Sequence, residues 1–164
     1  MKLFTKLSLL LFLAILSFSC TTDSIDTRVE NIELSLITPE DKTIEIEILE
    51  LINNYRLSKG LNALENMSVV KSVAYTHTDY MVENNEVSHA NFTKRSQYLK
   101  QYEGAKSVSE NVAYGYTSAE SVVNAWIKSE GHRVNIEGDF TNFDISAEEN
   151  DEGKWYYTNI FIKK

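Results

Sequence analysis

Two segments in the C-terminal half of the chain carry most of the information about its fold. Residues 110–115 are Glu-Asn-Val-Ala-Tyr-Gly, and residues 126–136 are Trp-Ile-Lys-Ser-Glu-Gly-His-Arg-Val-Asn-Ile. Between them, Thr117-Ser118-Ala119-Glu120 has the pattern of a capping box, in which a hydroxyl and an acidic side chain satisfy the first amides of a helix. This pattern predicts a helix that runs to about Ser129 and ends just before His132.

The residues upstream predict three further helices, over residues 38–60, 68–84 and 92–102. The first begins with Thr38-Pro39-Glu40-Asp41, which combines a hydroxyl cap, a proline in the first turn and acidic groups at the positive helix end. Downstream, residues 143–147 and 154–162 are rich in β-forming residues and flank the turn-forming sequence Asn150-Asp151-Glu152-Gly153, which indicates a hairpin. Helices followed by a small antiparallel sheet indicate the α+β class.

The first twenty residues have the features of an export signal. Lys2 and Lys6 precede an apolar stretch over residues 7–18, which is shorter than the roughly 20 residues needed to span a bilayer. Cys20, the only cysteine of the chain, comes next after Ser19. A single cysteine at this place resembles the signal of bacterial lipoproteins, in which the cysteine is lipidated and becomes the mature N-terminus. The alternative is an ordinary secretory signal followed by an incidental cysteine.

These features predict a signal peptide over residues 1–19, a lipidated N-terminus and tether over residues 20–38, and one domain over residues 39–164. Within the tether, apolar and polar residues alternate over residues 32–36, so a short strand is expected there. The expected localisation is the bacterial cell envelope, with the protein exported and anchored to a membrane through Cys20.

The charge balance argues against some classes of partner. The chain has 24 acidic and 16 basic residues, for a net charge of −8, and it has no run of Lys or Arg. Nucleic-acid binding and electrostatic attachment to a membrane both need clustered basic residues, so neither is expected. A single cysteine also excludes an internal disulfide framework.

The chain has three histidines, and two of them lie where a side chain can reach a cleft. His77 shares the apolar stripe of the second predicted helix, so we expect it to be packed. His89 lies just past that helix, and His132 just past the later one. With Glu110 they provide two imidazoles and a carboxylate, a set that Zn²⁺ or another divalent cation prefers, with one position left open. Their spacing matches no local metal motif, and two surface histidines beside a solvated glutamate are the alternative interpretation.

Several motifs follow one another in a recognisable order. They are Asn54-Tyr55-Arg56, Ser88-His89, the segment 110–115, Val122-Val123-Asn124-Ala125-Trp126 and the segment 129–136. The series resembles the CAP superfamily, also called SCP-like, which includes cysteine-rich secretory proteins, antigen 5 and plant pathogenesis-related proteins. The similarity extends over residues 44–162 and is greatest to the short bacterial extracellular branch.

This resemblance implies a three-layer α-β-α sandwich with a broad cleft, which is lined by two histidines and two acidic residues and holds a divalent metal in several members. The matching positions give three predicted metal ligands, His89, Glu110 and His132. Ser129 occupies the place of the fourth residue, which is a glutamate in many eukaryotic members. Ser129, Asn111 and Arg133 are predicted to line the cleft. The alternatives are that Asn111 bonds loop backbone and that Arg133 forms an ion pair.

We therefore predict a binding module rather than an enzyme. Glu110 cannot be a metal ligand and a free catalytic base at once, and the sequence has no His-Glu-x-x-His motif, no Gly-x-Ser-x-Gly motif and no catalytic cysteine. The expected partner is a small ligand, a lipid or a protein. The first alternative is a metal-dependent hydrolase acting on peptide or cell-envelope material, and the second is a lipid- or sterol-binding protein.

Overall fold

The structure is a computed structural model that describes residue 34 and residues 36–164. Its helices and strands are α1 (Thr43–Ser58), β1 (Glu65–Asn66), α2 (Ser68–Asn84), α3 (Phe92–Glu103), β2 (Ser107–Tyr114), α4 (Ala119–Lys128), α5 (Glu130–Ile136), β3 (Asn142–Glu149) and β4 (Trp155–Lys163). The expected signal peptide, the expected lipidation site Cys20 and most of the expected tether lie outside the described residues. In the part of the chain that is described, no helix has the length and apolar character to cross a bilayer.

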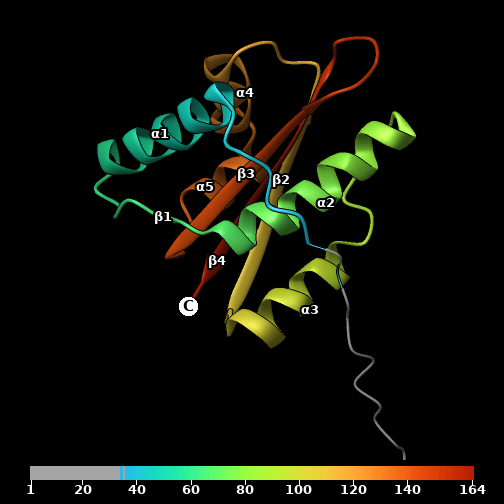
Figure 1. Ribbon diagram of the computed structural model, residues 1–164. Coiled ribbons are helices and arrows are strands. Elements are labelled where there is room, and N and C mark those ends of the chain that lie inside the picture. Colours follow the sequence, from blue (N-terminus) through green and yellow to red (C-terminus); the bar gives the residue numbers. More distant parts are fainter. Residues whose placement is uncertain (1–33, 35) are drawn as a thin grey trace, which may run out of the picture. The chain divides into compact units, whose positions relative to one another are not determined.

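In the described residues the strands form one four-stranded sheet with the order β1-β3-β4-β2 (Figure 1). β3 and β4 form the predicted hairpin, and the side chain of Asn150 accepts the amides of Glu152 and Lys154 in its turn. β2 pairs antiparallel with β4 along its whole length, whereas β1 pairs parallel with β3. The sheet is therefore mixed and larger than the small antiparallel sheet expected from the sequence, and β2 forms one of its edges.

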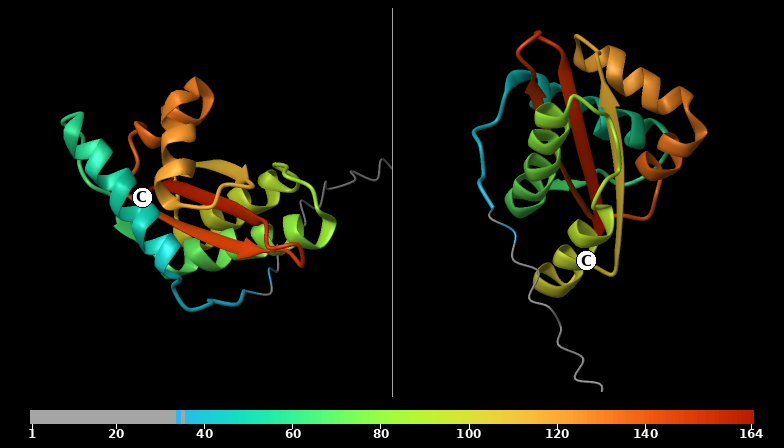
Figure 2. Two further views of the ribbon diagram at one scale, coloured as in Figure 1. Left: turned by 90° about the horizontal axis from the view of Figure 1, so that it is seen from above. Right: turned by 90° about the vertical axis from the view of Figure 1, so that its right-hand side faces the viewer.

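Helices cover both faces of this sheet (Figure 2). On one face, α1, α4 and α5 cover the larger apolar core, which includes Ile48, Ile52, Trp126, Ile136, Phe143, Ile145 and Phe161. On the opposite face, α2 and α3 cover a second cluster, which includes Val70, Val73, Leu99, Ile160 and Ile162. The three-layer α-β-α arrangement and the α+β class are therefore confirmed.

The start of α1 differs from the prediction by about one helical turn. The helix begins at Thr43, after the expected start at Thr38, because the chain is first held by other contacts. The Thr38 hydroxyl bonds the hydroxyl of Ser72 on α2, so it does not cap α1. The carboxylate of Glu45 instead accepts the backbone amide of Lys42 at 2.7 Å and thereby fixes the first turn.

Glu45 also joins α1 to the rest of the fold. It is 1% exposed and accepts hydrogen bonds from the Lys71 ammonium on α2 at 2.8 Å and from the Ala147 amide on β3 at 2.8 Å. The short strand expected over residues 32–36 is absent where it can be checked, since Leu34 and Leu36 lie outside any strand. Both leucines pack against the α2 side of the core instead.

Candidate functional site

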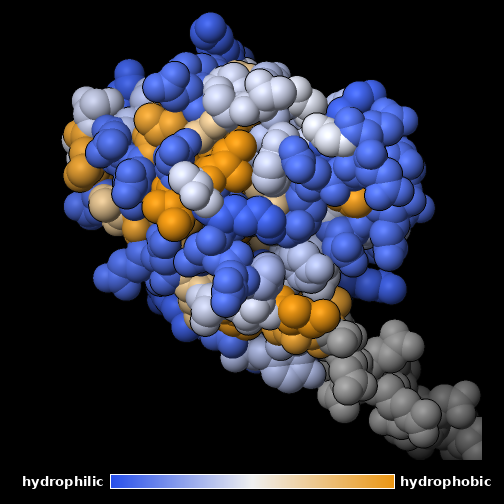
Figure 3. Space-filling view, turned by 45° about the horizontal axis from the view of Figure 1, so that its top comes forward, coloured by the Kyte–Doolittle hydropathy of each residue, from blue (hydrophilic) through white to orange (hydrophobic). Residues whose placement is uncertain are grey.

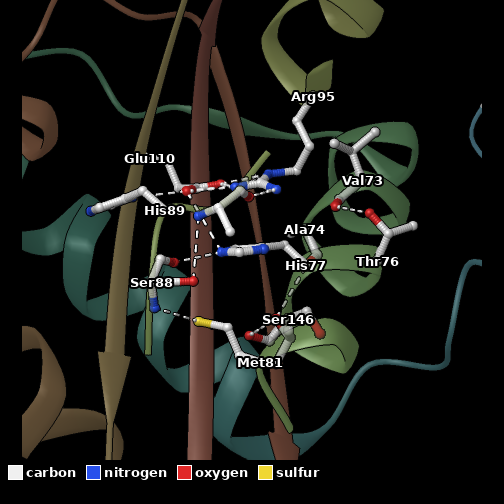
Figure 4. A network of polar contacts seen from close by, with 12 residues as sticks. Val73, Ala74, Thr76, His77, Met81, Ser88, His89, Arg95, Glu110 and Ser146 are labelled. Carbon is white, nitrogen blue, oxygen red and sulfur yellow. Dashed lines mark hydrogen bonds and ion pairs between the residues drawn. The ribbon is translucent and has the colours of Figure 1, made fainter. Parts of the chain in front are cut away.

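The loop between α2 and α3 carries His89, and α2 holds this loop in place. α2 ends at Asn84, and the next residue, Asn85, adopts a left-handed conformation with φ of 49° that turns the chain away from the helix. His77 on α2 is 1% exposed, as expected for a packed histidine, and its Nε2 lies 2.6 Å from the Ser88 carbonyl (Figure 4). Because a carbonyl only accepts, Nε2 carries the proton and donates to it.

Glu110 on β2 lies at the centre of the polar network in Figure 4. Its carboxylate accepts hydrogen bonds from Nε and Nη2 of Arg95 on α3, at 2.8 and 2.9 Å. His89 Nδ1 lies 2.9 Å from Oε1 of the same carboxylate. Glu110 and Arg95 are buried, whereas the His89 side chain is 54% exposed. The buried ion pair therefore fixes the carboxylate that contacts the exposed imidazole of His89.

The electrostatics of this network keep Glu110 ionised. Burial by itself raises the pKa of Glu110, but the hydrogen bonds from His89 and Arg95 and the charge of Arg95 outweigh it, so that the net pKa is lowered. Burial is also the main cause that lowers the pKa of His77, which favours its neutral form. An ionised Glu110 accepts a hydrogen bond from the protonated Nδ1 of His89, and this leaves Nε2 as the atom that faces outward.

The other histidine, His132, is held from the opposite face of the sheet. Neighbouring residues of a strand point to opposite faces, so Asn111 points away from Glu110 and toward α5. Asn111 Nδ2 donates to the backbone carbonyl of His132 at 3.0 Å. Asn135 on α5 donates to Asn111 Oδ1 at 2.8 Å and, at 3.3 Å, to the carbonyl of Glu110.

Ser129, between α4 and α5, orients the ring of His132. His132 Nδ1 lies 2.9 Å from Ser129 Oγ, and Ser129 adopts an extended backbone that separates the two helices. Burial is the main cause that lowers the pKa of His132, and the charge of His89 lowers it further.

The structure brings the three predicted ligands to one edge of the sheet without arranging them as a complete metal centre. In the described part of the chain, no group of three or more His, Cys, Asp or Glu side chains has metal-site geometry. The two rings nevertheless share a feature that suits metal binding, because each has its Nδ1 held by a protein oxygen. Metal-binding histidines are oriented in this way by an outer partner.

The other predicted site residues take different places. Ser129 is half-exposed beside His132. Asn111 is fully buried and contacts the site through the backbone of His132. Arg133 is half-buried and donates to the carbonyl of Ile127 at 2.9 Å, so that it joins α5 to the end of α4.

Arg95 is the main residue that the sequence does not reveal. It lies four residues before Leu99 on α3, and both are buried, so its position on the apolar face of that helix is the available signal. Asn135 is the second such residue, because its contact with Asn111 depends on how α5 is placed against β2.

The chain matches a known protein family over most of its length. Residues 49–161 match the model of the cysteine-rich secretory protein family, CAP. Two proteins of Bacillus subtilis (strain 168) are similar in sequence, the uncharacterized membrane protein YlbC with 34% identity over 126 residues and the uncharacterized protein YkwD with 32% over 124 residues. These regions are 74% and 73% of this chain, but the chain spans only 35% and 47% of those relatives.

Solved bacterial structures show the same fold. An outer surface protein from Borrelia burgdorferi matches with a TM-score of 0.68 at 23% identity, over 76% of this chain and 96% of that one. An extracellular protein with an SCP domain from Bacillus anthracis matches with a TM-score of 0.64 at 27% identity, over 73% of this chain and 40% of that one. The chain therefore belongs to the CAP family of extracellular proteins, in its bacterial branch.

Proposed function

We propose that this protein is an exported, lipid-anchored CAP-domain binding module in which His89 and His132 hold a divalent cation such as Zn²⁺. The observation that carries the proposal is that a side chain contacts Nδ1 in each ring. Glu110 contacts Nδ1 of His89, and Ser129 contacts Nδ1 of His132. Nδ1 is engaged in each ring, so Nε2 is the nitrogen that would coordinate the cation, with Nδ1 of His132 donating to Ser129 Oγ. Bound there, the cation would act as a Lewis acid toward a carbonyl or carboxylate of the ligand.

The proposed role of Glu110 follows from its contacts. Arg95 takes both carboxylate oxygens in a bidentate pair, so in this arrangement Glu110 orients His89 as the outer partner of a metal-binding histidine. Its direct coordination of the cation, which the sequence predicts, would require Arg95 to move. The two imidazoles would thus hold the cation, and the ligand would bind at the coordination positions that the protein leaves open.

The same contacts favour binding over hydrolysis. A hydrolytic site needs a base that is free to take a proton from water, and its pKa should lie near neutral pH. Glu110 is instead paired with Arg95 and has a lowered pKa, which makes it a weak base. The site would therefore suit coordination of a ligand better than activation of water.

The described grooves do not favour a lipid or sterol as ligand. One groove of about 490 Å³ beside α1 is lined by Ile46, Leu49, Glu50, Asn53, Asn54 and Asn66. A second, of about 430 Å³, lies at the start of α2 and is lined by residues that include Asp41, Lys71 and Asp144. Most residues that line the two grooves are polar, and neither groove includes His89 or His132. On the face seen in Figure 3, apolar patches are separated by hydrophilic side chains, whereas a lipid carrier would need continuous apolar surface.

Calorimetric titration of the chain without its signal peptide with Zn²⁺ tests the proposal. We expect saturable binding of one ion with micromolar affinity, abolished in the His89→Ala/His132→Ala double variant. Ser129→Ala should weaken binding by about 10- to 100-fold, the usual effect of removing an outer partner. Glu130→Gln is the matched control, because Glu130 is exposed beside Ser129 and makes neither contact.

Equal heats from the wild type and the double variant would refute the metal site. Zinc-dependent cleavage of peptides or envelope fragments by the wild type would replace the binding proposal with the hydrolase alternative. Binding of a fluorescent lipid without zinc would support the lipid alternative.

A further inference from the structure

Two consecutive residues of β2 hold the two histidines from opposite faces of the sheet. Glu110 lies on the face of α2 and α3, because Val112 on the same side of the strand packs with Met81 of α2. Asn111 lies on the opposite face, because Ala113 belongs to the core beneath α1, α4 and α5. Glu110 contacts the ring of His89, and Asn111 contacts the backbone of His132. One peptide unit therefore separates the two attachments.

Both polar atoms of the Asn111 side chain form hydrogen bonds. Its side chain is completely buried, its Nδ2 donates to His132, and its Oδ1 accepts from Asn135. A buried amide in this position cannot turn without leaving a polar group unpaired, which is costly. The contact is therefore a rigid link between β2 and α5.

α5 depends on such polar links. The helix has seven residues, of which Ile136 is the buried one, so its apolar packing rests on one core side chain and polar contacts supply the rest of its attachment. At its C-terminal end, Arg56 on α1 donates to the carbonyls of Ile136 and Gly138, at 2.6 and 2.9 Å. At its N-terminal end, where His132 lies, the contact with Asn111 takes the same role.

We propose that Asn111 is a positioning residue that sets the place of His132 relative to His89 by holding α5 against the edge of the sheet. Its importance for metal binding rests on the proposed function, whereas its role in placing α5 does not. β2 suits this role because its backbone pairs with β4 from Ser107 to Tyr114, so that neighbouring side chains cannot shift relative to each other. The separation of the two histidines would then follow from the pleat of one strand.

Asn159 on β4 provides a matched control. It is the register partner of Asn111, it is also completely buried, and the parity of β4 places it on the same face of the sheet. Its Nδ2 donates to the carbonyl of Asp144, at 2.8 Å, its Oδ1 accepts no hydrogen bond from the described residues, and its side chain forms no hydrogen bond with α5. Asn159→Ala therefore removes the same amide from the same layer without releasing His132.

The first arm of the experiment uses the metal-free chain without its signal peptide. Hydrogen exchange of the α5 amides should accelerate in Asn111→Ala by about tenfold, the factor that corresponds to one ordinary hydrogen bond, and it should stay unchanged in Asn159→Ala. Amides of α3 should be unaffected in both. Equal acceleration of α5 in the two variants, or none in Asn111→Ala, would overturn the proposal whether or not the protein binds zinc.

The second arm adds Zn²⁺ and follows the ring ¹⁵N signals of the histidines. In the wild type and in Asn159→Ala, Nε2 of both His89 and His132 should shift on binding. In Asn111→Ala, the His89 signal should still shift while His132 does not, with affinity about 10- to 100-fold weaker. A joint shift of both signals at unchanged affinity would overturn the proposal. If even the wild type failed to bind zinc, the proposed function would fail, and the first arm alone would decide the role of Asn111.

Asn135→Ala protects the test against a variant that does not fold. Asn135 is half-exposed, so its truncation leaves no large cavity, but it removes the donor that orients the Asn111 amide. We expect a smaller change in the same direction in both arms. Unchanged α5 exchange in a folded Asn135→Ala protein would also count against the proposal.

Discussion

Arg95 and Glu110 form an ion pair that is almost completely removed from solvent. Arg95 is 3% exposed and Glu110 6% exposed, and Arg95 Nη1 also donates to the carbonyl of Ala90 at 2.7 Å. The pair therefore ties α3 and the loop that carries His89 to β2. Each charge is tolerated in the interior because the other neutralises it, and loss of one partner is more damaging than loss of both.

Arg95→Met should destabilise the fold by about 3–5 kcal/mol, because it leaves the Glu110 carboxylate buried without its cation. The pKa of Glu110 should rise, since burial would no longer be outweighed by the arginine. Urea denaturation at neutral pH measures the change in the free energy of unfolding.

The double variant Arg95→Met/Glu110→Gln is the control for this prediction. It removes both charges, so it should be more stable than Arg95→Met alone. If the single and the double variant unfold at the same urea concentration, the buried charge is not the cause of the loss.

At the scale of elements, Asp144 joins β3 to the start of α2. It is 4% exposed, and its carboxylate accepts the amides of Met67 at 3.1 Å and Ile145 at 2.9 Å. Burial raises the pKa of Asp144 from 3.8 to about 6, despite these two hydrogen bonds and the charge of Lys71. The folded protein therefore binds a proton at Asp144 more tightly than the unfolded chain does.

This raised pKa predicts the direction of a pH dependence. Between pH 3.8 and about 6 the folded state holds more protons than the unfolded state, so the contribution of Asp144 to stability falls as the pH rises through this interval. The full loss is about 3 kcal/mol and is reached above this interval. Asp144→Asn cannot ionise and should lack this fall.

Thermal or urea unfolding of the wild type and Asp144→Asn over this pH range measures the effect. The free energy of unfolding of the variant, taken relative to the wild type, should increase as the pH rises and then become constant. A difference in the free energy of unfolding that does not change with pH would show that folding does not raise the pKa of Asp144.

At the scale of the whole molecule, the proposed lipid anchor would hold the domain at a membrane. Acyl chains on Cys20 would hold the protein at a membrane, since each buried methylene contributes about 0.8 kcal/mol to membrane binding. We expect the full chain, produced in a bacterial host that processes lipoproteins, to be found in the membrane fraction. Cys20→Ala should move it to the soluble exported fraction.

Metabolic labelling with a tagged fatty acid provides the independent readout for this prediction. The wild type should take up the label and Cys20→Ala should not. The same distribution of both proteins between the fractions would support the alternative of an ordinary secretory signal.

The helices show how far local patterns in the sequence are informative. The stripe that includes Val70, Val73 and Met81 predicts a helix over residues 68–84, and α2 has these bounds. α5 has no separate signal, because Ser129 alone separates it from α4 and the sequence does not show that the backbone becomes extended there. β2 is also missed, since its central residues from Glu110 to Ala113 are all buried and give no alternation of polar and apolar residues.

Neighbouring residues in the chain were enough to predict the α+β class, most helices and the hairpin, whereas the choice of His89, Glu110 and His132 came from the resemblance to the CAP family, and their role in metal binding stays a prediction. Capping, periodicity and turn formation depend on residues that are close in sequence, so they can be recognised without coordinates. The pairing of Arg95 with Glu110 and the contact of Asn111 with His132 required the folded structure. These contacts join separate elements, and they depend on the pleat of β2, which places the side chains of Glu110 and Asn111 on opposite faces of the sheet.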